Sequence, residues 1–166
     1  MKYTGYDHTA TAKKAGTERF VELMRKHYGF KNLGTLVVRP MRNGKGMSVH
    51  ATGRAMDLGF DKDVHDMPEG KHREIAVAVM KWLVANYVAL GVEEVHDYKG
   101  LTKKGTEQWG RAWRCSRTGG KPGWKDWTET DNGQPGGFWI HVELSPAMAD
   151  DDTAVELAFR KLPKAI

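Results

Sequence analysis

Apolar positions recur at helical spacing in three stretches of the chain. Over residues 11–28 they lie three or four positions apart, which predicts an amphipathic helix that ends at Gly29. The spacing is clearest over residues 72–90, where one apolar stripe runs to a stop at Gly91. A last helix is predicted over residues 150–162, because the acidic residues at its start can cap it.

Short runs of β-branched and aromatic residues predict strands. Four are expected, at residues 35–40, 55–60, 92–98 and 138–144. The first reads TLVVRP and is stopped by its proline, and the last reads FWIHVEL. Residues 99–137 are rich in Gly, Trp, Lys and Thr but show little periodicity, so they are predicted as one long loop.

The order of these elements is helix, strand, strand, helix, strand, long loop, strand, helix. This order favours an α+β fold in which a small, mainly antiparallel sheet packs against helices. A length of 166 residues suits one domain with a real core. Neither a repeat nor a linker divides the chain, so residues 1–166 are expected to form a single domain.

Composition and charge narrow the choice of partners. The formal net charge is +5 and the isoelectric point is about 9.3, which favours anionic partners such as cell-wall polymers. A nucleic-acid partner is not expected, because no short nucleic-acid motif is present. No apolar run approaches membrane-spanning length, so no membrane insertion is expected. The first residues lack the apolar centre of a signal peptide, which predicts synthesis in a cytoplasm without an export signal.

The residue types available for metal binding are restricted. Cys115 is the only cysteine, which excludes an intramolecular disulfide and a cysteine-based zinc site. A metal ion would have to be held by histidines and carboxylates. His50 and Asp57 flank a turn-prone glycine in the stretch SVHATGRAMD, and His141 lies on the last predicted strand. Two histidines and an aspartate suit a catalytic zinc, which keeps its fourth position for water.

The form S-x-H-x-x-G-R-A-x-D, followed far downstream by W-x-H-x-E on a predicted strand, resembles the M15-type zinc peptidases. That family includes D-alanyl-D-alanine carboxypeptidases and many bacteriophage endolysins. The positions in register are Ser48, His50, Gly53, Arg54, Ala55 and Asp57. The resemblance extends more loosely over residues 36–144. It implies a small α+β fold, one Zn²⁺ held by His50, Asp57 and His141, and hydrolysis of a peptide bond in peptidoglycan.

The remaining motif positions have supporting roles in this interpretation. Gly53 would let the backbone bend, so that the two ligands approach one ion from both sides of a turn. Ser48 is expected to hydrogen-bond near the first histidine and fix its ring. Arg54 would hold a carboxylate or face solvent, and a structural role is preferred. Ala55 would leave room behind the metal.

The chain departs from the family at the general base. Family members usually carry Asp or Glu three residues before the last histidine ligand, and this chain has Phe138 there. Glu143 points to the same face of the strand as that histidine. Glu129 and Asp131 lie in the predicted loop, and His96 alternates with acidic and aromatic neighbours on the third strand. Asp131 and Glu143 are favoured equally as the catalytic proton acceptor.

The family also uses an arginine ahead of the first histidine ligand to hold a substrate carboxylate. Arg39, at the end of the first predicted strand, and Arg42, in the following loop, are the candidates. A planar guanidinium suits bidentate binding of a carboxylate. Arg39 is preferred, because strand ends position side chains better than loops do.

Two functions from different classes follow. The first is a zinc-dependent, endolysin-like metallopeptidase of bacteriophage type that acts on peptidoglycan at the bacterial cell wall, made in the host cytoplasm and monomeric. Cleavage within a cross-linked stem peptide is preferred to removal of a terminal residue. The alternative is a non-catalytic cell-wall-binding module with a degenerate peptidase site, which Phe138 at the usual base position supports.

Overall fold

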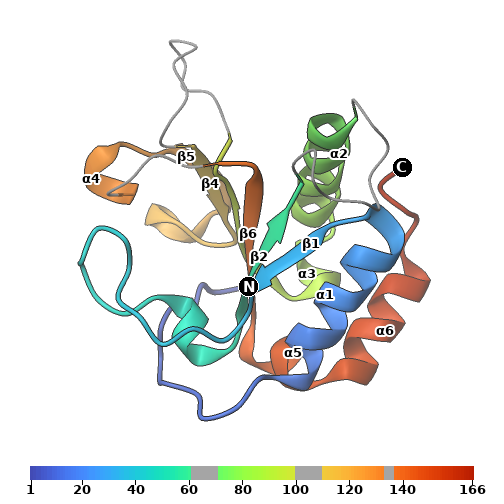
Figure 1. Ribbon diagram of the computed structural model, residues 1–166, viewed down its shortest axis with the longest axis horizontal. Coiled ribbons are helices and arrows are strands. Elements are labelled where there is room, and N and C mark those ends of the chain that lie inside the picture. The colour runs from blue at the N-terminus through green and yellow to red at the C-terminus, as the bar shows by residue number, and fades with distance from the viewer. Residues whose placement is uncertain (61–70, 100–109, 133–136) are drawn as a thin grey trace.

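The computed structural model describes residues 1–60, 71–99, 110–132 and 137–166 (Figure 1). The side chain of Glu129, one of the predicted proton acceptors, lies outside this description. So does much of the predicted loop at residues 99–137, apart from the segments named below.

Within the described residues, six strands form a single antiparallel sheet. They are β1 (Lys31–Gly34), β2 (Ala55–Gly59), β3 (Val92–Asp97), β4 (Arg111–Arg114), β5 (Gly123–Asp126) and β6 (Trp139–Leu144). Their order across the sheet is β1-β2-β6-β3-β4-β5, and all neighbours run antiparallel. The prediction of an α+β fold with a mainly antiparallel sheet is confirmed.

The longer helices cover one side of the sheet. The α-helices are α1 (Ala15–Tyr28), α2 (His72–Ala85), α3 (Tyr87–Leu90), α4 (Glu129–Asn132), α5 (Pro146–Asp150) and α6 (Asp152–Lys161). Two short 3₁₀ turns are η1 (Val49–Thr52) and η2 (Thr118–Gly120). In Figure 1, α1, α2 and α6 lie together on one side of the sheet, and the loop that follows β1 lies on the other.

Strand alternation explains why the two faces of the sheet differ. One face is apolar and fully buried, with Met56, Leu58, Val95, Ile140 and Val142 in one cluster with the helices. Burial of this face supplies the hydrophobic driving force for folding. The intervening positions point to the opposite face. That face is therefore free to carry polar chemistry.

The polar face is organised by the strand register. Asp57 on β2 lies directly opposite His141 on β6, and His141 lies opposite His96 on β3. Two residues further along the same pair of strands, Glu143 of β6 lies opposite Glu94 of β3. All of these except the half-buried Asp57 are buried. The register thus gathers five ionisable side chains from three strands.

The prediction of a strand at residues 35–40 is wrong. The edge strand is β1, and residues 35–39 run as irregular chain, with Val37 41% and Val38 59% exposed. The β-branched composition favoured a strand, but the sheet edge pairs with Lys31–Gly34 instead. The irregular segment lies against η1, where the Val37 amide donates to the carbonyl oxygen of His50 at 3.3 Å.

The prediction of one long loop at residues 99–137 is also partly wrong. Its described portion contains β4 and β5, which extend the sheet beyond β3. These strands are only four residues long. A strand of this length is too short to show a clear alternation of apolar and polar residues in the sequence.

Candidate metal centre

The three predicted ligands lie together on the polar face. His50 comes from η1, Asp57 from β2 and His141 from β6, and their ligand atoms all lie within 4.8 Å of one another. His50 Nε2 is 3.3 Å from Asp57 Oδ2, and His141 Nδ1 is 2.9 Å from Asp57 Oδ1. In the described part of the chain, this is the one group of three or more such residues arranged to hold a metal ion.

The SVHATGRAMD stretch forms a capped 3₁₀ turn that leads into a strand. The Ser48 hydroxyl caps the turn by accepting from the backbone N–H of His50 at 3.3 Å. Gly53 ends the turn at φ 72°, a left-handed conformation that favours glycine. The turn brings the first histidine back over β2, where Asp57 lies. The expectation for Gly53 matches this geometry, whereas Ser48 contacts the backbone of His50 and not its ring.

The ring of His50 is held by a residue that the motif did not suggest. Its Nδ1 lies 2.8 Å from the carbonyl oxygen of Thr35. The Nε2 of His141 lies 3.0 Å from Oε1 of Glu143. Because both partners are acceptors, these two ring nitrogens carry the protons. Metal-ligating histidines usually donate their second N–H to a carbonyl or carboxylate in this way.

The other nitrogen of each ring faces the other ring. If both rings are neutral with the protons placed as above, neither of these two nitrogens carries a proton. His50 Nε2 and His141 Nδ1 are 3.1 Å apart, and in neutral imidazoles both carry lone pairs directed toward the same place. Such an arrangement is stable only with a positive charge between the nitrogens, either a proton or a metal ion. The donor set, two imidazole nitrogens and a carboxylate, fits zinc.

The electrostatics of the triad agree with this conclusion. Burial opposes the charged form of His141, but hydrogen bonds to Asp57 and Glu143 outweigh burial and raise its pKa to about 10. Burial also opposes ionisation of Asp57, yet hydrogen bonds with His141 and His50 hold its pKa well below the usual range. In the metal-free protein the triad therefore keeps a proton that a cation would replace.

Glu143 lies behind His141, on the side of the ring away from the triad's facing nitrogens. It is 5% exposed. Burial alone would raise the pKa of Glu143, but its hydrogen bond with His141 lowers it. Of the two favoured proton acceptors, Glu143 is thus already engaged in orienting a predicted ligand.

The second favoured acceptor, Asp131, lines the cleft but is also engaged. Its Oδ1 pairs with Lys125 Nζ at 2.6 Å, and its Oδ2 accepts from the N–H and hydroxyl of Thr128 at 3.1 and 3.0 Å. Burial opposes ionisation of Asp131, but these contacts together outweigh it and lower the pKa of the carboxyl group. Phe138, at the usual base position, is 49% exposed and meets Phe60 edge-on.

A cleft of about 310 Å³ opens beside the triad. Two triad members, His50 and His141, reach it, as do the acids Glu94, Asp131 and Glu143. The cationic lining residues are Arg39, Arg42, Lys45, Arg114, Arg117 and Lys125. Both predicted substrate arginines are therefore at the cleft, and its charge favours an anionic ligand.

The two substrate arginines are held differently. The Arg42 guanidinium lies over the rings of Tyr98 and Trp139, 5.2 and 5.1 Å from their centroids. Arg39 makes one long contact, from Nη1 to the carbonyl oxygen of Pro40 at 3.4 Å. Stacking fixes a planar guanidinium in place. Arg42 is thus the better oriented of the two, against the initial preference for Arg39.

Glu94 was not among the predicted proton acceptors. It lines the cleft, pairs with Arg114 and is buried. Burial and the neighbouring Glu143 raise its pKa to about 7, although Arg114 acts in the opposite direction. The available sequence signal was its alternation with His96, which places both on one strand face. His96 itself packs between Tyr98 and Trp127 rings.

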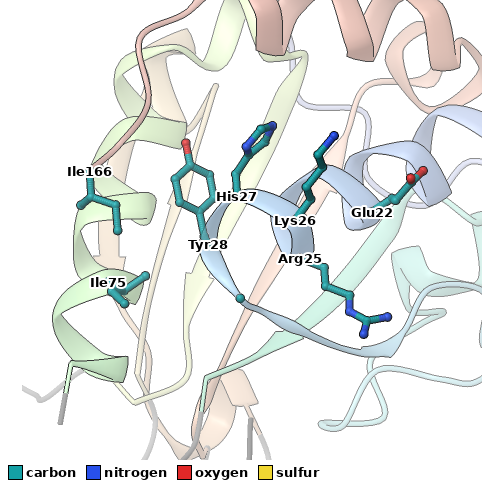
Figure 2. Close-up of a pocket in the computed structure, with 8 residues that line it drawn as sticks. Glu22, Arg25, Lys26, His27, Tyr28, Ile75 and Ile166 are labelled. Atoms are coloured by element: carbon teal, nitrogen blue, oxygen red, sulfur yellow. The ribbon is translucent and has the colours of Figure 1, made fainter. Parts of the chain in front are cut away.

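A larger hollow lies on the helical side of the sheet. Its volume is about 620 Å³, and it is lined by the C-terminal half of α1, by Ile75 of α2 and by Ile166. Figure 2 shows these lining residues. None of the triad residues lines it. The smaller cleft is the candidate site, because the triad and the cationic side chains meet there.

Comparison with protein families gives one match. Residues 9–123 match the family described as VldE, C-terminal domain. The matched span contains His50 and Asp57 and ends before His141. No curated protein and no solved structure matches the chain. None of the helices in the described ranges is both long and apolar enough to cross a membrane.

Proposed function

This chain belongs to the VldE, C-terminal domain family, and from its candidate metal centre we propose that it is a zinc-dependent peptidase. The proposed substrate is a peptide bond in the stem peptides of bacterial peptidoglycan, and the proposed site of action is the cell wall. A monomer remains the expected state.

One observation carries the proposal. The nitrogens of His50 and His141 that face each other are 3.1 Å apart, and each ring has its second nitrogen bonded to an acceptor. Asp57 completes the set. Three ligands with an open side toward a cleft are typical of catalytic zinc, whereas structural zinc usually has four protein ligands.

The chemistry divides between the ion and the chain. A bound zinc would activate water and polarise the scissile carbonyl group. His50, Asp57 and His141 would hold it. Arg42, and Arg39 beside it, would bind a carboxylate of the substrate and so orient the peptide.

Three carboxylates are candidates for the proton acceptor. Glu143 and Asp131 remain predictions, and the structure adds Glu94 to them. A general base works best when its pKa lies near the operating pH. Of these three carboxylates, Glu94 meets that condition, since its pKa is raised to about 7.

The alternative function is a wall-binding module without catalysis. Phe138 favours it, because an exposed phenyl ring stands where the resembled peptidases carry an acid. A module of this kind would keep the cationic cleft and bind wall polymer, but would release no peptide.

The test is digestion of purified stem peptides and intact peptidoglycan, with mass spectrometry of the products. We expect new peptide termini that disappear when zinc is removed with a chelator and return when zinc is restored. The fragment masses would identify the bond. Retention of the protein on peptidoglycan without new termini, across several wall chemistries, would favour the binding module.

A further inference from the structure

The first ten residues lie across the elements that carry the candidate metal centre. The Ala10 amide donates to the carbonyl oxygen of Ala51 in η1 at 2.8 Å. Thr4 bonds Glu93 at the start of β3 through its N–H at 3.0 Å and its hydroxyl at 2.7 Å. Tyr3 lines the metal cleft, with Arg114 stacked 4.3 Å from its ring. Residues 3–10 form an N-terminal strap.

Arg54 connects this strap to two of the ligand-bearing strands. It stands at the entry to β2, three residues before Asp57, and its side chain is 1% exposed. Its Nη1 donates to the carbonyl oxygen of Leu144 at the end of β6 at 2.8 Å, and its Nη2 donates to the carbonyl oxygen of Gly5. The structural role expected for Arg54 fits these contacts.

The charge of Arg54 is balanced inside the protein. Glu93, also 1% exposed, lies 3.6 Å from Nη1 of Arg54. A buried ion pair is tolerated only when hydrogen bonds replace the lost water. The strap supplies several of these bonds, namely the two Thr4 donors to Glu93 and the Gly5 acceptor for Arg54. Without the strap, Glu93 would lose both Thr4 donors and Arg54 would lose the Gly5 acceptor.

We propose that the N-terminal strap and Arg54 form a positioning clamp for the metal centre, so that docking of the strap and binding of zinc strengthen each other. This inference rests on the proposed metal site. The clamp joins η1, β2 and β6, which carry the three ligands, and a ligand set binds a metal well only when its relative positions are fixed. Coupling between two binding events is reciprocal.

The strap also reaches the residue behind His141. Tyr3 and Glu143 line the same cleft. Burial and the nearby acids Glu143 and Glu94 raise the pKa of Tyr3 far above its usual value, so the phenol stays a neutral donor. The strap thus lines the cleft together with Glu143, the partner of His141, and also contacts the elements that carry all three ligands.

The experiment measures zinc affinity by competition with a chelator in the full chain. Thr4→Val removes the hydroxyl that bonds Glu93 and is expected to weaken zinc binding by roughly threefold, which is less than the loss of about tenfold or more for direct partners of metal ligands. Thr4→Ser should restore it. Thr9→Val is the matched control, because the Thr9 hydroxyl bonds only the exposed Tyr6 hydroxyl at 2.9 Å.

Hydrogen exchange of the same proteins gives the reciprocal readout. Zinc is expected to slow amide exchange in residues 4–10 of the unaltered chain, and Thr4→Val should reduce this protection. If the unaltered chain binds zinc but Thr4→Val binds it equally well and zinc leaves exchange in the strap unchanged, the clamp is refuted while the metal site stands. If the unaltered chain binds no zinc, both proposals fail.

Discussion

Glu143 offers the sharpest test of how the site is built. Its Oε1 lies 3.0 Å from Nε2 of His141, and both side chains are buried. Glu143→Gln keeps the size of the side chain and an acceptor oxygen but removes the charge. If Glu143 orients His141 and makes it a better ligand, the substitution must act on zinc affinity. If Glu143 is the proton acceptor, it must act on turnover.

The expected magnitude follows from the contact. Loss of a hydrogen-bonding partner of a metal ligand lowers affinity by about 10- to 100-fold, which corresponds to roughly 1.4–2.7 kcal/mol of binding free energy. The lower half of this range is expected, because glutamine can still accept from Nε2 through its amide oxygen. Glu143→Ala, which removes the acceptor altogether, should lie in the upper half.

The assay separates the two roles. Chelator competition gives the zinc dissociation constant, and stem-peptide hydrolysis at saturating zinc gives the turnover number. We expect Glu143→Gln to weaken zinc binding and to retain most of its turnover once zinc is saturating. An unchanged zinc dissociation constant together with lost turnover would refute this reasoning and would restore Glu143 as the proton acceptor.

Four further expectations concern the same site. His50→Ala, Asp57→Ala and His141→Ala should each abolish stoichiometric zinc, as measured by elemental analysis after dialysis. Since zinc displaces the proton that His141 holds with a pKa of about 10, zinc affinity should fall as the pH falls, by about tenfold per pH unit for one proton; a pH-independent dissociation constant would contradict this. Gly53→Ala should destabilise the fold by about 1–2 kcal/mol in urea unfolding, because φ is 72° there. Arg42→Gln should raise KM for carboxylate-bearing peptides and leave that for amidated peptides unchanged.

Several features were determined by the sequence alone. The apolar stripes of α1 and α2 and the strand runs of β2, β3 and β6 are local patterns, and each element lies where its pattern predicts. The second predicted helix divides at Asn86 into α2 and α3. Spacing alone was a weak signal for His50, Asp57 and His141, but the match of their surrounding motifs to the resembled peptidases selected three side chains that lie together.

The groups that surround those side chains depend on the folded arrangement of the chain. The strand register sets Glu143 behind His141 and Glu94 beside Glu143, and this register depends on pairing between segments far apart in the chain. The carbonyl of Thr35 reaches His50 because β1, and not residues 35–40, occupies the sheet edge. The neighbours that orient a ligand or shift a pKa act through space. A linear pattern specifies the chemistry of each side chain, but the folded arrangement specifies which groups share a buried, low-dielectric environment.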